Sequence, residues 1–105
     1  MNTKILACTL ALATLPALSH AAGDATAGAA KSAVCSACHG QGGAQPIMPT
    51  YPRLAGQSEG YIEYAIKTYK SQERKGAQAA LMYPMVQNLS DQDIADLAAY
   101  FSTQQ

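Results

Sequence analysis

The stretch Cys35-Ser36-Ala37-Cys38-His39 decides how the rest of this chain must fold. Two thiols three residues apart on a helical turn project to the same side, where each can add to one vinyl group of a porphyrin. His39 directly follows the second thiol, so its imidazole is held against the porphyrin face and can ligate the iron. The pattern therefore predicts one covalently attached haem c, bound through Cys35 and Cys38 and ligated by His39.

Four other interpretations of this stretch explain less of the sequence. A thioredoxin-like redox pair belongs to a βαβ context that the chain lacks. A zinc site needs four ligands, and after Cys8 and His20 only the cysteines and the histidine of the motif remain. A structural disulfide leaves the adjacent histidine unexplained and closes only a small loop. Chance is disfavoured because the chain has one Phe and no Trp, so a haem would supply the bulk that its core lacks.

Residues 1–21 have the layout of a secretory signal peptide. Lys4 supplies a short basic region, an apolar run follows from Ile5 to Leu18, and small residues come next. Cleavage after Ala21 places small side chains at the last and third-last positions of the leader. An apolar run of about 14 residues broken by Pro16 falls short of the ~20 that span a bilayer. We therefore expect export to the periplasm, cleavage, and no membrane span after processing.

Residues 22–105 are enough for one small domain, which at this size usually needs a metal, a disulfide or an oligomeric contact to stabilise it. The full chain has seven basic and seven acidic residues, and one of the basic residues, Lys4, belongs to the leader. The mature domain thus carries a net charge of about −1, which argues against nucleic acid or an anionic membrane as a partner.

Helical patterns predict an all-α domain with three main helices. The first is expected over 25–34, with Asp24 as its N-cap and a surface of small residues that permits close packing. The second begins at its cap Ser58, ends near residue 71, and has apolar residues at three- and four-residue spacing. The third begins at Ser90 with an acidic first turn that suits the helix dipole. No useful length of sequence alternates with a period of two, so we expect no β-sheet.

The segments between these helices are expected to be irregular. Residues 40–57 are rich in glycine and proline, which predicts a loop with repeated turns. Before the third helix, Pro84 is expected to hold Tyr83 in an extended conformation. Residues 81–83 should therefore form a strap rather than a helix.

A sixth ligand for the iron would come from a methionine, because no second histidine follows the leader. Filling both axial positions suits electron transfer, and ligation by His and Met raises the reduction potential in cytochromes c. Met48 lies inside the turn-rich loop, where the chain would have to cross quickly from one haem face to the other. Met82 and Met85 are better separated from His39, and spacing alone leaves the choice between them open.

The chain resembles the class I c-type cytochromes, and within them the single-haem domains of small bacterial periplasmic electron carriers. The resemblance covers nearly all of residues 22–105 and implies a small fold of three main helices and loops wrapped around one haem. It also implies that Gly28 lies where the first and last helices cross, against Leu97 and Tyr100. It rests on Cys35-Ser36-Ala37-Cys38-His39-Gly40, Tyr51-Pro52-Arg53-Leu54-Ala55-Gly56-Gln57, Met82, and Leu89-Ser90-Asp91-Gln92-Asp93-Ile94 with Leu97-Ala98-Ala99-Tyr100-Phe101.

The resemblance assigns roles to individual residues. In such proteins the methionine seven residues before the leucine of the Leu-Ser-Asp helix start is the sixth ligand, which selects Met82 here and leaves Met85 as a packing residue. The Pro52 carbonyl is expected to accept a hydrogen bond from the outer nitrogen of His39, fixing its tautomer and strengthening its bond to the metal. Arg53 is expected near the haem, where it can pair with a propionate.

These features indicate an electron carrier rather than an enzyme. We expect a monomer or weak dimer that exchanges single electrons with a protein donor and a protein acceptor at an exposed haem edge. One alternative is the haem subunit of a larger oxidoreductase, such as a flavocytochrome sulfide dehydrogenase. That subunit would need an interface patch, for which Tyr51, Tyr61, Tyr64 and Tyr69 are candidates. A second alternative, a gas-binding cytochrome with an open sixth site, is disfavoured because two well-placed methionines are available.

Overall fold

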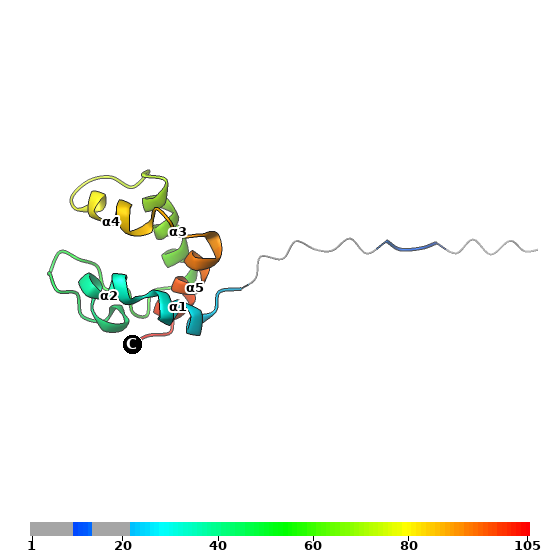
Figure 1. The fold of residues 1–105 in the computed structure, drawn as a ribbon, viewed down its shortest axis with the longest axis horizontal. Helices are drawn as coiled ribbons and strands as arrows, with labels where there is room; N and C mark the ends of the chain where they lie inside the picture. The colour runs from blue at the N-terminus through cyan, green and yellow to red at the C-terminus, as the bar shows by residue number, and fades with distance from the viewer. Residues whose placement is uncertain (1–9, 14–21) are drawn as a thin grey trace, which may run out of the picture.

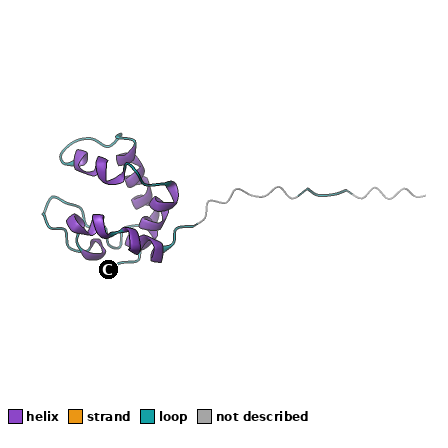
Figure 2. Cartoon of the chain, in the orientation of Figure 1, coloured by secondary structure: helices purple, strands orange, loops and turns teal. Residues whose placement is uncertain are grey.

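The structure is a computed structural model that describes residues 10–13 and 22–105, so most of the predicted signal peptide falls outside the described residues. The described part is all-α and contains no strand (Figure 2), which confirms the predicted fold class. None of its helices is long and apolar enough to cross a membrane. Its helices in chain order are α1 Ala25–Lys31, α2 Ala33–His39, the 3₁₀ helix η1 Gln41–Gly43, α3 Glu59–Lys70, α4 Ala79–Val86 and α5 Asp91–Ser102.

The helices are arranged in two groups joined at one end of the domain (Figure 1). The helices α1 and α2 lie on one side and α4 lies on the other, with α3 and α5 connecting them. The helix α5 packs against both α1 and α3. Its apolar stripe of Leu97, Ala98 and Phe101 joins Ile62 of α3 in the core. This scaffold holds α2 and α4 on opposite sides of the molecule.

Polar side chains begin three of the helices where the sequence predicts them. Asp24 accepts hydrogen bonds from the first turn of α1, and Ser58 accepts one from the Tyr61 backbone N–H in α3. Ser90 and Asp93 form a reciprocal capping box at the start of α5. Each cap satisfies backbone donors that the first helical turn leaves unpaired, so these three starts are confirmed.

The predicted first helix over 25–34 is in fact two helices that meet at Ser32. The buried Ser32 hydroxyl donates to the Ala29 carbonyl at 2.8 Å, and the Ser32 backbone N–H also donates to that carbonyl, at 3.2 Å. These bonds tighten the last turn of α1 and end its regular hydrogen bonding. The chain then starts α2, which carries the whole of the Cys35–His39 motif.

The predicted strap over 81–83 is wrong, because these residues lie inside α4 together with Pro84. A proline disfavours the helical conformation in the residue before it but does not forbid it. Within this short helix Pro84 removes only the bond to the carbonyl of Ala80, a residue near the start of the helix. Burial of Val86, which is 3% exposed, and packing of α4 against α3 favour the helix.

The helices α1 and α5 cross at Gly28, as the resemblance implies. A Cβ atom at this position would lie 2.0 Å from the Asp96 carbonyl oxygen and 2.7 Å from the Tyr100 Cβ. Only glycine allows such close contact between the two backbones. The crossing therefore depends on the absence of a side chain at Gly28.

A buried carboxylate fastens the same pair of helices. Asp96 of α5 is 3% exposed and accepts hydrogen bonds from the Asp24 backbone N–H at 2.8 Å, the Lys31 Nζ at 2.7 Å and the Gln92 Nε2 at 2.8 Å. The Lys31 ammonium, together with the two neutral donors, lowers the pKa of Asp96 from 3.8 to about 2. Lys31 also pairs with Asp93 at 2.8 Å. Asp96 thus secures both ends of α1.

Replacing Gly28 by alanine should destabilise the folded protein by about 1–3 kcal/mol, because the new methyl group forces α1 and α5 apart. Urea unfolding of the haem-loaded protein measures this change. Gly60→Ala is the matched control, since Gly60 lies in α3 and a Cβ atom there would have no neighbour within 4 Å. That substitution should stabilise by about 0.5–1 kcal/mol. Equal effects of the two substitutions would contradict the close crossing.

In Asp96→Asn, the free energy of unfolding should fall less steeply as the pH is lowered. A carboxyl whose folded-state pKa is depressed stabilises fully above its unfolded pKa, and this contribution is lost as the pH falls from 3.8 toward about 2. The slope of unfolding free energy against pH over that range should therefore be shallower in Asp96→Asn. Asp91→Asn, on the exposed first turn of the same helix, should keep the wild-type slope. An unchanged slope in Asp96→Asn would show that this carboxylate does not carry the effect.

Candidate functional site

The helix α2 presents two thiols in different surroundings. Cys35 is half-buried and packs against the core cluster, whereas Cys38 is exposed. Burial raises the pKa of the Cys35 thiol, which therefore stays protonated and apolar. Both are free thiols within the described residues. One helical turn thus offers two thiols that are available to form thioethers.

The imidazole of His39 is held in one tautomer. His39 ends α2 and is 5% exposed, and its Nδ1 lies 2.8 Å from the Pro52 carbonyl oxygen. Because a carbonyl can only accept, Nδ1 must carry the proton of the neutral ring and donate it to this bond. The other nitrogen, Nε2, then has a free lone pair, which is the form that a metal requires. The hydrogen bond expected from the resemblance is present in the structure.

The loop over 40–57 brings Pro52 to His39. Gly43 adopts a φ of +69°, and a Cβ atom there would lie 2.6 Å from the Leu54 Cβ and 3.0 Å from the Phe101 ring. Its carbonyl accepts hydrogen bonds from the backbone N–H groups of Leu54 at 2.9 Å and Ala55 at 3.1 Å. The loop is thereby folded back on itself beside α5, with Pro52 at its turn toward α2.

Arg53 is exposed, and its side chain is engaged within the same loop. Its Nη1 donates to the Ala44 carbonyl at 2.9 Å, and its Nε is 3.4 Å from the Ala55 carbonyl. The Gln57 side chain donates in turn to the Arg53 carbonyl. These bonds cross-link the loop around Pro52, and the expected contact between Arg53 and a propionate stays a prediction.

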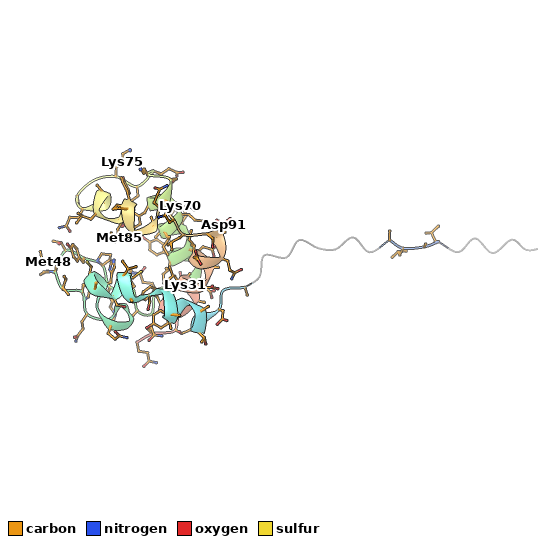
Figure 3. All side chains as sticks on the ribbon, viewed as in Figure 1. Lys31, Met48, Lys70, Lys75, Met85 and Asp91 are labelled. Atoms are coloured by element: carbon orange, nitrogen blue, oxygen red, sulfur yellow. The ribbon has the colours of Figure 1, made fainter. Side chains whose placement is uncertain are left out.

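The three candidate methionines differ in place and exposure. Met82 is half-buried in α4, whereas Met85 in the same helix is 46% exposed and Met48 in the loop after α2 is 44% exposed. Figure 3 shows Met85 on the side of α4 that is nearest to α2. Because residues three apart are neighbours on a helix surface, α4 carries both of its thioethers close together. Sulfur donors therefore come from the helix on the opposite side of the molecule from His39.

The donors and the surrounding side chains fit a covalently attached haem. The site offers two free thiols that can form thioether bonds to a porphyrin. It also offers a buried imidazole with Nε2 available and methionine sulfurs on a second helix, which are ligands for haem iron rather than for a hard cation. Within residues 10–13 and 22–105, no three His, Cys, Asp or Glu side chains form a group that could hold a metal ion. Partly buried apolar residues such as Leu54, Ile66 and Leu89 pack against the core cluster, so part of their apolar surface is still exposed and could contact a large apolar group.

The contacts that hold α4 to α3 were not predicted from the sequence. The Tyr83 hydroxyl donates to the Arg74 carbonyl, and the Arg74 guanidinium lies 4.8 Å from the centre of the Tyr69 ring. The Lys70 Nζ donates to the Leu89 carbonyl at 2.5 Å. An arginine between two tyrosines is the only sequence signal for the first pair of contacts. It is not specific, because the contact depends on how the chain turns between the two helices.

Comparison with known proteins places the domain in a family. A model of the cytochrome c family matches residues 16–105. Cytochrome c-554(548) of Halomonas halodenitrificans is 57% identical over 84 residues, which cover 80% of this chain and 100% of that protein. Cytochrome c4 of Pseudomonas aeruginosa is 47% identical over 104 residues, which cover 99% of this chain and 49% of that protein. The chain thus spans the whole of the first relative but about half the length of the second.

A solved structure agrees with these matches. The crystal structure of reduced recombinant cytochrome c4 from Pseudomonas stutzeri aligns with a TM-score of 0.69 and 43% sequence identity, over 80% of this chain and 47% of that one. The all-α fold, the motif on α2 and the similarity along nearly the whole domain lead to one conclusion. The chain belongs to the cytochrome c family, as a class I electron-transfer protein with covalently bound haem c.

Proposed function

We propose that this chain is a single-haem electron carrier with His39 and Met82 as its axial ligands. It is exported to the periplasm by a signal peptide over residues 1–21, and its domain over 22–105 shuttles single electrons between a protein donor and a protein acceptor. When bound, the haem supplies reversible one-electron oxidation and reduction. The hydrogen bond between His39 Nδ1 and the Pro52 carbonyl, 2.8 Å long, is the observation that carries the proposal.

This hydrogen bond prepares His39 for permanent ligation. A partner on Nδ1 fixes the ring orientation and makes Nε2 a stronger donor, as it does for other metal-bound histidines. The His39 side chain is almost fully buried, which limits the access of water to the ring. Arg53 supports the arrangement from the loop that carries Pro52, through its bond to the Ala44 carbonyl. These residues thus favour the same ligation by His39 in the ferrous and the ferric protein.

Burial supports Met82 over the other methionines as the second axial ligand. An axial sulfur should be shielded from solvent, and Met82 is half-buried whereas Met85 and Met48 are 46% and 44% exposed. The position of Met82, seven residues before Leu89 at the start of the Leu-Ser-Asp stretch, gives the same choice. A thioether ligand raises the reduction potential, and a filled sixth position favours electron transfer over binding of gases or turnover of a substrate.

The alternative function, a haem subunit of a larger oxidoreductase such as a flavocytochrome sulfide dehydrogenase, has one supporting observation. Of the four candidate tyrosines, Tyr61 and Tyr64 are 48% and 64% exposed, and their ring centres are 6.4 Å apart on α3. Tyr51 and Tyr69 are half-buried. A pair of exposed aromatic rings covers much less surface than a permanent protein–protein interface buries. Purification of the native protein distinguishes the two functions, since a subunit would co-purify with its enzyme and a carrier would not.

Replacing Met82 by alanine should lower the reduction potential by at least about 0.1 V, a fraction of the ~0.8 V range over which axial ligands set haem potentials. An optical redox titration of the mature protein measures this shift and also reports haem type. The reduced variant should bind carbon monoxide, whereas the wild-type protein should not. Met85→Ala is the matched control on the same helix and should leave both properties unchanged. If Met85→Ala produces the shift and Met82→Ala does not, Met85 is the ligand.

Replacing Cys35 by serine should leave haem attached through Cys38 alone and reduce the yield of covalent haem several-fold, because one thioether can no longer form. Haem that stays with the polypeptide on a denaturing gel is the measurement. Ser36→Ala lies between the two cysteines and removes a buried hydroxyl that has no hydrogen-bond partner among the described residues. This control should mature normally. A normal yield from Cys35→Ser would exclude Cys35 as an attachment site.

A further inference from the structure

The helix that carries Met82 is joined to the domain by an exposed segment. In Figure 1, α4 lies beside α3 and away from α1 and α2, and α3 is its main packing partner. Residues 71–78, which connect the two helices, are all exposed. Two of them, Gln72 and Ala77, have φ angles of 60° and 41°, a region that residues other than glycine seldom adopt. The backbone of the connection alone therefore does not fix α4, and contacts of the connection with α3 and α4 must hold the bend.

One such contact runs through Arg74. The Tyr83 hydroxyl, on α4, donates to the Arg74 backbone carbonyl. Arg74 is itself held to α3 twice, because its backbone N–H donates to the Thr68 carbonyl at 3.2 Å and its guanidinium lies 4.8 Å from the centre of the Tyr69 ring. Tyr69 is half-buried and belongs to α3. Tyr83 is thereby linked, through Arg74, to a residue of the connection that is itself bonded to α3.

A second contact secures the other end of α4. The Lys70 Nζ, at the last residue of α3, donates to the Leu89 carbonyl at 2.5 Å just beyond α4. Val86, in the last turn of α4, is buried. With this end fixed, the motion of α4 that would have to be resisted is a swing of its first half away from α3. Tyr83 is the residue that opposes this motion.

We propose that Tyr83 is a positioning residue for the sixth ligand of the haem iron. Its hydroxyl, through the hydrogen bond to the Arg74 carbonyl, restrains α4 and slows departure of the adjacent Met82 sulfur from the metal. Tyr83 itself touches neither the iron nor the sulfur in this role. The inference rests on the proposed function of Met82 as an axial ligand. It adds that the lifetime of that ligation depends on the hydrogen bond that ties α4 to the connection after α3.

The decisive variant is Tyr83→Phe, which removes only the hydroxyl. Imidazole is the probe, added in excess to the ferric haem-loaded protein, where it binds after the native sulfur ligand has left. Because one hydrogen bond contributes about 0.5–1.5 kcal/mol, we expect the limiting rate of imidazole binding to rise about 2- to 10-fold. The reduction potential should fall in the same variant.

Tyr64→Phe is the matched control. Tyr64 lies on α3, is 64% exposed, and makes no side-chain hydrogen bond within the described part of the chain. Its variant should bind imidazole at the wild-type rate. Arg74→Gln removes the guanidinium from the Tyr69 ring but keeps the carbonyl, so it should change the rate in the same direction by a smaller factor.

A double substitution separates this inference from the proposal on which it rests. In Met82→Ala the iron is already open, so adding Tyr83→Phe should not speed imidazole binding further. If Met82→Ala keeps wild-type ligation, the proposed ligand is wrong whatever Tyr83 does. If Met82→Ala opens the iron but Tyr83→Phe leaves the limiting rate unchanged, Tyr83 is not a positioning residue. An acceleration that persists in the Met82→Ala background, or a loss of global stability with no change in rate, overturns the inference as well.

Discussion

The hydrogen bond from His39 Nδ1 to the Pro52 carbonyl joins the two segments from which one side of the site is built. The helix α2 supplies His39 at its C-terminal end, and the loop over 40–57 supplies the acceptor. Cys35 of α2 and Leu54 of the loop each pack against the core cluster, and the hydrogen bond fixes how the two segments meet. The loop is folded back by the two hydrogen bonds to the Gly43 carbonyl and cross-linked by Arg53. The tautomer and orientation of the His39 imidazole therefore depend on the folded conformation of the whole loop.

The other helices provide the rigid frame that this arrangement needs. The helices α1 and α5 approach so closely at Gly28 that no side chain fits between them, and Asp96 fastens the start and the end of α1 to α5. The apolar core between α5 and α3 is small. The largest fully buried side chains of the described residues are Phe101, Ile94 and Leu97, all on α5. Close backbone contact and buried polar bonds therefore add to the burial that stabilises these short helices. A bound haem would add the apolar volume that the polypeptide does not supply.

Local chemistry explains which parts of this structure are predictable from sequence. The caps Asp24, Ser58 and Ser90 act on the next few residues, so their effects could be predicted without knowing the fold. The break at Ser32 and the helix around Pro84 could not, because both depend on tertiary context. The bond between His39 and Pro52 was expected only from the resemblance to class I cytochromes. Asp96 looks like a surface residue in sequence, and its burial follows from partners that lie as many as 72 positions away.

Under the proposed ligation by Met82, the helical state of α4 changes how the chain would hold the sulfur ligand. In an extended strap each residue can rotate independently, and a ligand keeps its place only through its own bond to the metal. In a helix Met82 and Tyr83 move together, so a bond made by one side chain restrains the other. Electron transfer is faster when the ligand geometry changes little between oxidation states. If Met82 ligates the iron as proposed, the hydrogen bond of Tyr83 within α4 and that of Lys70 just beyond its end would limit that change.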